Sequence, residues 1–265
     1  MGKILALKPT ELDQYLTVAQ NLAELARPIL QKYYRSGIGV EDKADSTPVT
    51  LADRAAEAAM RQYINQSCPG HGIKGEEYGD ENIAADFVWV LDPIDGTKSF
   101  MTGKPLFGTL IALCYQQQPI IGIIDMPILD ERFVAAHGRG TKRNQTPLKT
   151  RACPTLSQAA LYATTPYMFQ DQAAEKFNRL VSRVKYPLFG ADCYGYGLVA
   201  SGFADLVVEA QLKPYDYLAC AVVMREAGGV AVDWQGRDLS LRSGDQVLMA
   251  GDQNLLAEAL AILKE

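Results

Sequence analysis

The chain has 265 residues, 48% hydrophobic and 22% charged, which is typical of a globular protein with one large domain or two small ones. Its 26 basic and 31 acidic side chains give a formal charge of −5, which argues against a protein that binds nucleic acid. The 2 histidines are too few for a histidine-rich metal site, so any enzyme chemistry is expected to depend on carboxylates.

The first half of the chain predicts two helices followed by strands. Apolar residues recur at helical spacing over residues 12–33 and again over residues 51–65. Short apolar runs bounded by turn residues then predict strands over residues 87–91, 107–115, 119–124 and 132–136. The polar stretch 138–151 predicts a turn and a linker.

The second half predicts alternating strands and helices. The expected strands cover residues 159–164, 186–189, 204–209, 229–233 and 246–250. The expected helices cover residues 172–184, 194–201, 217–227 and 254–263. This alternation favours an α/β protein in which helices cover the sheets. We place a boundary near residue 150, between an N-terminal α+β subdomain (1–150) and a C-terminal α/β subdomain (151–265).

Cysteine spacing and hydropathy bear on the cellular location. The 5 cysteines are scattered and show no C-x-x-C spacing, so we expect reduced thiols in or near the core. The first apolar stretch is too short for a signal peptide, and no apolar run approaches the ~18 residues of a membrane span. We therefore expect a cytoplasmic protein with no membrane partner.

One segment carries the strongest chemical signal, namely Asp92-Pro-Ile-Asp-Gly-Thr97 directly after a predicted buried strand. Two carboxylates three residues apart at a strand end can share hard cations. Gly96 lets the backbone approach a ligand closely, and the amides that follow can meet a phosphate at a helix start. Asp, Pro and Gly are also turn formers, so an ordinary β-turn is the alternative.

Three other acidic positions are individually ambiguous. Glu76 and Glu77 follow Gly75 in a loop, where an exposed acidic turn would suffice. Asp53 falls in the first turn of a predicted helix, where a negative charge is favourable. Asp216 precedes another predicted helix, where it could simply be an N-cap.

In combination and in this order, these motifs closely resemble the signature of the inositol monophosphatase family. The resemblance runs from about Leu12 to the C-terminus. It implies a layered αβαβα sandwich of the metal-dependent sugar-phosphatase type, with lithium-sensitive phosphomonoesterase activity. It also implies Mg²⁺ as cofactor, in two to three ions with Mn²⁺ as a substitute, and a homodimer.

The resemblance also assigns the metal ligands. One Mg²⁺ would be held by Glu76, Asp92 and the carbonyl of Ile94, and a second by Asp92, Asp95 and Asp216. A third, weaker ion would lie near Glu76. These assignments agree with the preference of magnesium for oxygen ligands.

Catalytic and substrate contacts follow from the same resemblance. The catalytic residues would be Thr97, Asp53 and Glu76, with the Thr97 hydroxyl and Asp53 together orienting the attacking water. The Gly96 and Thr97 amides, beside Asp95, would contact the phosphate. The substrate would be a small phosphate monoester.

Departures from the inositol-cleaving members favour the histidinol-phosphate phosphatase branch of the family. Tyr215 precedes Asp216 where those members carry Trp, and residues 190–197 replace a small-residue stretch. Asp192 and Glu209 would then form an acidic pocket for the amine and imidazole of L-histidinol phosphate. The alternatives are an inositol-1-monophosphatase or broad sugar-phosphate phosphatase, and a non-catalytic phosphatase-like binding protein.

Overall fold

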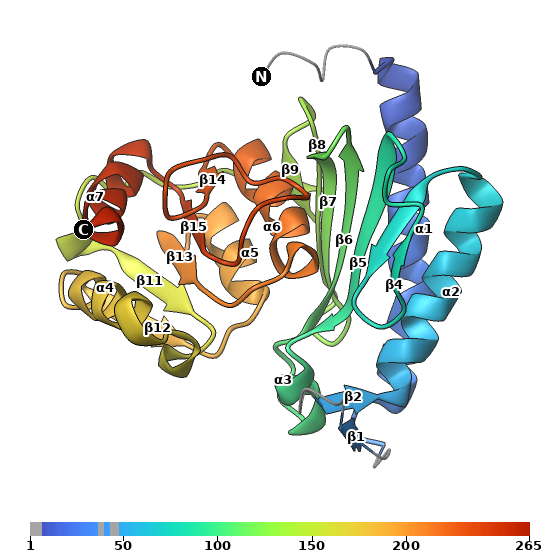
Figure 1. Cartoon of the computed structure of the whole chain (residues 1–265), viewed down its shortest axis with the longest axis horizontal. Coiled ribbons are helices and arrows are strands. Elements are labelled where there is room, and N and C mark those ends of the chain that lie inside the picture. The colour runs from blue at the N-terminus through green and yellow to red at the C-terminus, as the bar shows by residue number, and fades with distance from the viewer. Residues whose placement is uncertain (1–6, 37–39, 43–47) are drawn as a thin grey trace.

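The computed structural model describes residues 7–36, 40–42 and 48–265. Its helices and two main sheets form five layers, in the order helix, sheet, helix, sheet, helix (Figure 1). This arrangement confirms the αβαβα sandwich that the sequence predicts. A middle layer of helices lies between the two sheets.

The first sheet has eight strands, in the order β10-β9-β8-β7-β6-β5-β3-β4. Its strands are β3 Gly72–Gly75, β4 Gly79–Glu81, β5 Phe87–Asp95, β6 Gly108–Tyr115, β7 Gln118–Met126, β8 Glu131–Ala136, β9 Thr141–Arg143 and β10 Thr146–Pro147. All neighbours are antiparallel except β3 and β5. The apolar faces of α1 (Pro9–Tyr33) and α2 (Leu51–Ser67) pack on its outer side. Two short strands, β1 (Val40–Asp42) and β2 (Pro48–Thr50), pair beside α3 (Thr97–Met101).

The second sheet has five strands, in the order β12-β11-β13-β15-β14. These strands are β11 Ala160–Ala163, β12 Tyr186–Phe189, β13 Leu206–Glu209, β14 Val230–Val232 and β15 Val247–Ala250. Helices α4 (Asp171–Val181) and α7 (Gln253–Lys264) cover its outer face, and α5 (Tyr194–Ala200) and α6 (Pro214–Glu226) form the middle layer. Two single 3-10 turns, η2 (Leu156–Gln158) and η3 (Pro166–Met168), complete the elements. Because α6 contacts both sheets, residues 217–224 are all buried.

Three local features differ from the sequence prediction. Strand β5 continues through the acidic motif to Asp95, four residues beyond the predicted end. Glu76 and Glu77 lie in a turn, as predicted, but this turn joins a β3–β4 hairpin, and a β9–β10 hairpin occupies part of the predicted linker. The four strands of these hairpins lack the apolar runs from which the other short strands were predicted. The boundary near residue 150 stays a prediction.

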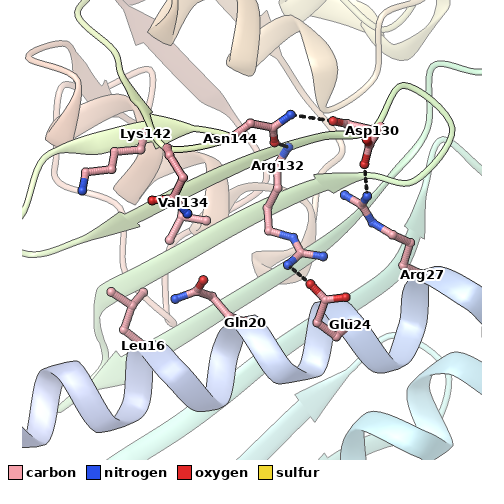
Figure 2. A pocket seen from close by; sticks show the side chains of 10 residues that line it. Leu16, Gln20, Glu24, Arg27, Asp130, Arg132, Val134, Lys142 and Asn144 are labelled. Atoms are coloured by element: carbon pink, nitrogen blue, oxygen red, sulfur yellow. Dashed lines mark hydrogen bonds and ion pairs between the residues drawn. The ribbon is translucent and has the colours of Figure 1, made fainter.

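A polar network joins α1 to the face of the first sheet that this helix covers. The buried Asp125 carboxylate on β7 accepts hydrogen bonds from Arg27 Nη2 at 2.7 Å and Arg132 Nε at 2.6 Å. The outer ends of these guanidinium groups pair with Asp130 and Glu24 beside a pocket of about 370 Å³ (Figure 2). This network fixes α1 against the sheet.

The thiols match the expectation for the core, since each of the five cysteines is free and buried. Within the ranges that the structure describes, no helix is both long and apolar enough to cross a bilayer.

Candidate metal and phosphate site

Two carboxylates meet where parallel strands end. Gly75 on β3 is registered with Leu91 on β5, so Glu76 and Asp92 are the next residues along the two neighbouring strands. The amide of Glu76 donates to the carbonyl of Leu91 at 3.2 Å, which continues the pairing. Carboxyl ends of parallel strands are common ligand sites in α/β folds. The structure thus brings together two residues that lie 16 positions apart.

A register shift in β5 brings a third carboxylate to the same place. Side chains three residues apart in a regular strand point to opposite faces, but the pairing of β5 with β6 is interrupted between Asp92 and Asp95. Oxygens of Asp92, Asp95 and Asp216 consequently lie within 4.8 Å of one another. Asp216 reaches them from the first turn of α6, where its carboxylate also accepts the Lys213 amide at 2.6 Å. We call these three residues the inner triad.

A second group of carboxylates lies between α2 and the β3–β4 turn. Oxygens of Asp53, Glu76 and Glu77 also lie within 4.8 Å of one another, and we call these residues the outer triad. Asp53 is 1% exposed, because the first turn of α2 packs against the sheet. Glu77 was not among the ligands expected from the sequence, although it adjoins Glu76.

The electrostatics of the inner triad favour a bound cation. Burial raises the pKa of Asp92, and the negative charges of Glu76, Asp95, Asp216 and Asp53 raise it further. Burial likewise raises the pKa of Asp95, and it raises the pKa of Asp216 to about 8. Repulsion of this kind is relieved when a metal ion replaces the protons.

The donor set fits a hard divalent cation. Asp92 is 2% exposed, and its Oδ1 has no hydrogen-bond partner in the described part of the chain. A buried, unpaired carboxylate oxygen is costly, so its occurrence here indicates a ligand. Mg²⁺ and Ca²⁺ both select such all-oxygen surroundings.

Gly96 and Thr97, the residues expected to contact phosphate, follow Asp95 at the start of α3. Gly96 adopts φ +88°, and a Cβ there would come within 3.0 Å of Asp192 Oδ2, so only glycine fits without strain. The Thr97 hydroxyl donates to the carbonyl of Ile94 at 3.1 Å. Thr97 is therefore held beside the proposed metal ligands at the start of α3. The assigned roles of Ile94, Gly96 and Thr97 stay predictions.

The two residues assigned to the alcohol part of the substrate already have protein partners. Asp192, at φ +48°, accepts a hydrogen bond from Ser99 Oγ at 2.7 Å. Glu209 accepts hydrogen bonds from the Thr164 hydroxyl at 2.6 Å and the Tyr196 hydroxyl at 2.5 Å. Burial raises the pKa of both carboxylates. Their role in substrate binding stays a prediction.

Both side chains nevertheless adjoin the inner triad. The charges of Asp192 and Glu209 raise the pKa of Asp95, and the amide of Cys193, next to Asp192, donates to Asp95 Oδ2 at 2.6 Å. An alcohol group next to the metal site would therefore meet acidic groups.

Comparison with known proteins agrees with this geometry. The model of the inositol monophosphatase family matches residues 11–265. The protein named "Bifunctional phosphatase IMPL2, chloroplastic", from Arabidopsis thaliana, is 48% identical over 97% of this chain and 77% of its own. A histidinol-phosphatase of Chlorobaculum parvum is 35% identical over 91% of this chain and 95% of its own.

A solved structure gives the same result for the fold. An inositol monophosphatase from Zymomonas mobilis superposes with a TM-score of 0.88 at 40% identity, covering 98% of this chain and 100% of that one. The family match spans nearly all of the chain, and it includes every residue of both triads. The chain therefore belongs to the inositol monophosphatase family.

Proposed function

We propose that this family phosphatase is a Mg²⁺-dependent phosphomonoesterase that hydrolyses L-histidinol phosphate to L-histidinol and phosphate. The observation that carries the metal-dependent chemistry is a buried Asp92 oxygen without a hydrogen-bond partner in the described residues. Asp92 belongs to the inner triad, and the charges of Glu76 and Asp53 from the outer triad act on it. Mn²⁺ satisfies the same donor set and could replace Mg²⁺.

Four acidic residues and one backbone carbonyl are assigned to metal binding. Glu76, Asp92, Asp95, Asp216 and the Ile94 carbonyl would hold the ions, with a third ion near Glu76. When bound, such ions neutralise the phosphate dianion, lower the pKa of water and stabilise the leaving alkoxide.

The remaining groups orient the reactants. The Thr97 hydroxyl and the Asp53 carboxylate position the attacking water, and the Gly96 and Thr97 amides with Asp95 position the phosphate. These groups complete the site without a histidine.

The substrate assignment is supported by acidic residues and by one relative. Asp192 and Glu209 offer negative charge to a protonated amine or imidazole, which inositol lacks. The relative from Chlorobaculum parvum is named a histidinol-phosphatase. Inositol-1-phosphate or another sugar phosphate is the alternative substrate, favoured by the 40% identity to the Zymomonas mobilis inositol monophosphatase.

Phosphate release distinguishes these substrates. We expect faster turnover of L-histidinol phosphate than of inositol 1-phosphate at matched concentration in Mg²⁺, with no activity in EDTA or in Asp92→Asn. Faster turnover of the inositol ester would support the alternative phosphatase. No metal-dependent release from any ester of a broad panel would support the non-catalytic binding protein instead.

We also propose a homodimer, located in the cytoplasm. Edge strand β12 presents Tyr186, Leu188 and Phe189 to solvent, and an exposed apolar edge favours association. Light scattering after gel filtration tests the stoichiometry, and fractionation of cells tests the location.

A further inference from the structure

Glu57, a buried acidic residue of α2, contacts the turn that carries two residues of the outer triad. Glu57 lies one helical turn after Asp53, on the face of α2 that packs against the sheet, and it is 0% exposed. Its Oε2 accepts the amide of Glu77 at 2.7 Å, and its Oε1 accepts the amide of Tyr78 at 3.1 Å. Glu57 thus binds the backbone of the turn that carries Glu76 and Glu77.

The neighbouring residues make room for this contact. A Cβ at Gly75 would lie 1.9 Å from Glu57 Oε1 and 2.5 Å from its Cδ, so a side chain at position 75 would displace the carboxylate. Arg61, one further turn along α2, donates to Glu57 Oε1 at 2.8 Å and compensates its buried charge.

Arg61 adds contacts between α2 and the other side of the turn. Its guanidinium group donates to the Gly79 carbonyl and pairs with Glu81 Oε2 at 3.3 Å. Glu57 and Arg61 therefore attach α2 to both ends of the β3–β4 turn.

Electrostatic repulsion within the outer triad explains why the turn needs to be attached to α2. Asp53 projects from α2, whereas Glu76 and Glu77 project from the turn, and their oxygens lie within 4.8 Å of one another. Like charges at this distance push the turn away from the helix. The two amide hydrogen bonds to Glu57 oppose that displacement, since a carboxylate accepts amide hydrogens strongly.

We propose that Glu57 is a positioning residue that acts through the turn backbone to hold Glu76 and Glu77 against Asp53, and so sets the affinity of the outer triad for a divalent cation. The inference rests on the proposed function only in taking such a cation as the ligand. Loss of groups that orient metal ligands typically weakens metal binding by about 10–100-fold.

The test measures Mn²⁺ binding to metal-free protein by the EPR signal of free Mn²⁺, without substrate. Glu57→Gln keeps the volume and one acceptor oxygen but loses the charge. We expect its weakest class of Mn²⁺ sites to bind about tenfold less tightly or worse. In turnover assays, kcat should recover at saturating metal, while the metal concentration for half activity rises by a similar factor.

Asp205→Asn is the matched control for a general loss of stability. Asp205 is another buried carboxylate that accepts an amide, from Ala160 at 2.8 Å, and a two-pronged contact from Arg151 at 2.6 and 2.7 Å. It lies at the second sheet, outside both triads. We expect this variant to lose stability and to bind Mn²⁺ as the wild type does.

A second variant approaches the same contact from the turn. Gly75→Ala keeps both Glu57 and Arg61 in the chain, but its Cβ would come within 1.9 Å of Glu57 Oε1 and 2.7 Å of Arg61 Nη2. It should therefore displace both side chains from the turn and reproduce the loss of Mn²⁺ affinity. It also takes the place of Glu57→Gln if that variant does not fold.

The outcomes are distinct. Wild-type Mn²⁺ affinity in a folded Glu57→Gln or Gly75→Ala protein would overturn the inference, and so would an equal loss in Asp205→Asn. If the wild type bound Mn²⁺ but hydrolysed no phosphate monoester, the proposed function would fail while this inference stood.

Discussion

At the scale of single residues, the Thr97 hydroxyl is the group whose loss is most informative. It donates to the Ile94 carbonyl at 3.1 Å, at the end of the strand that carries Asp92 and Asp95. If it orients the attacking water, Thr97→Ala should lower kcat by roughly 100-fold or more with a smaller change in KM. Thr97→Ser keeps the hydroxyl and should lose less than tenfold. Steady-state kinetics would contradict this role if only KM rose.

Replacement of Asp192 tests which substrate the site prefers. If its carboxylate binds the substrate amine, Asp192→Ala should weaken transition-state binding of L-histidinol phosphate by about 1.5–3 kcal/mol, the range for a charge-assisted hydrogen bond. Hydrolysis of p-nitrophenyl phosphate, which has no amine, should barely change. The measurement is kcat/KM for both esters.

Ser99→Ala separates this role from a structural one. It removes the 2.7 Å hydrogen bond to Asp192 but leaves the carboxylate, so selectivity should persist. Equal losses on both esters in the Asp192 and Ser99 variants would assign Asp192 to the scaffold around Gly96.

At the scale of elements, Asp125 tests how α1 is attached. This fully buried carboxylate binds both Arg27 and Arg132, so Asp125→Asn leaves two guanidinium groups without their buried countercharge. We expect a loss of about 3–5 kcal/mol in the free energy of unfolding by urea. The control Asp130→Asn removes a partner that is 87% exposed and should cost less than about 1 kcal/mol. A similar cost for the two variants would contradict this account.

The elements also show what the sequence could and could not predict. The long helices were predictable because their apolar periodicity extends over many residues, and most strands were predictable as apolar runs bounded by turn residues. The acidic motif was predictable as a strand end. The break in register between Asp92 and Asp95 was not, because it depends on pairing with β6. Glu57 carried one weak signal, a charged residue on the apolar face of a helix, but its turn partners lie 20 and 21 residues away.

Over the whole molecule, the candidate metal site links several separate elements of the fold. Glu76 follows β3, Asp92 and Asp95 lie on β5, Asp53 begins α2, and Asp216 begins α6. Each element is anchored by its own apolar contacts, so the core holds these like charges together. The site is therefore a source of instability that metal binding should relieve.

This arrangement predicts how stability depends on pH in the absence of metal. The pKa values of Asp92 and Asp95 are raised by burial and neighbouring charges, and that of Asp216 is raised from 3.8 to about 8. Between about pH 4 and pH 8 the native state therefore holds more protons than the unfolded state. By linkage, the free energy of unfolding falls as pH rises through this window. Burial lowers the pKa of His71, which opposes the trend below about pH 6.5.

Urea unfolding in EDTA at pH 5, 6, 7 and 8 measures the effect. We expect the urea midpoint to fall across the series, most clearly from pH 6.5 to 8, where the opposing contribution of His71 fades. Excess Mg²⁺ should flatten or reverse the fall, because metal binding displaces protons from the same carboxylates and tightens as pH rises. Asp216→Asn removes a group with a raised pKa and should also flatten the fall in EDTA. A urea midpoint that rose steadily from pH 6.5 to 8 in EDTA would show that these carboxylates are not protonated in the native state. That result would remove the main electrostatic argument for a metal site.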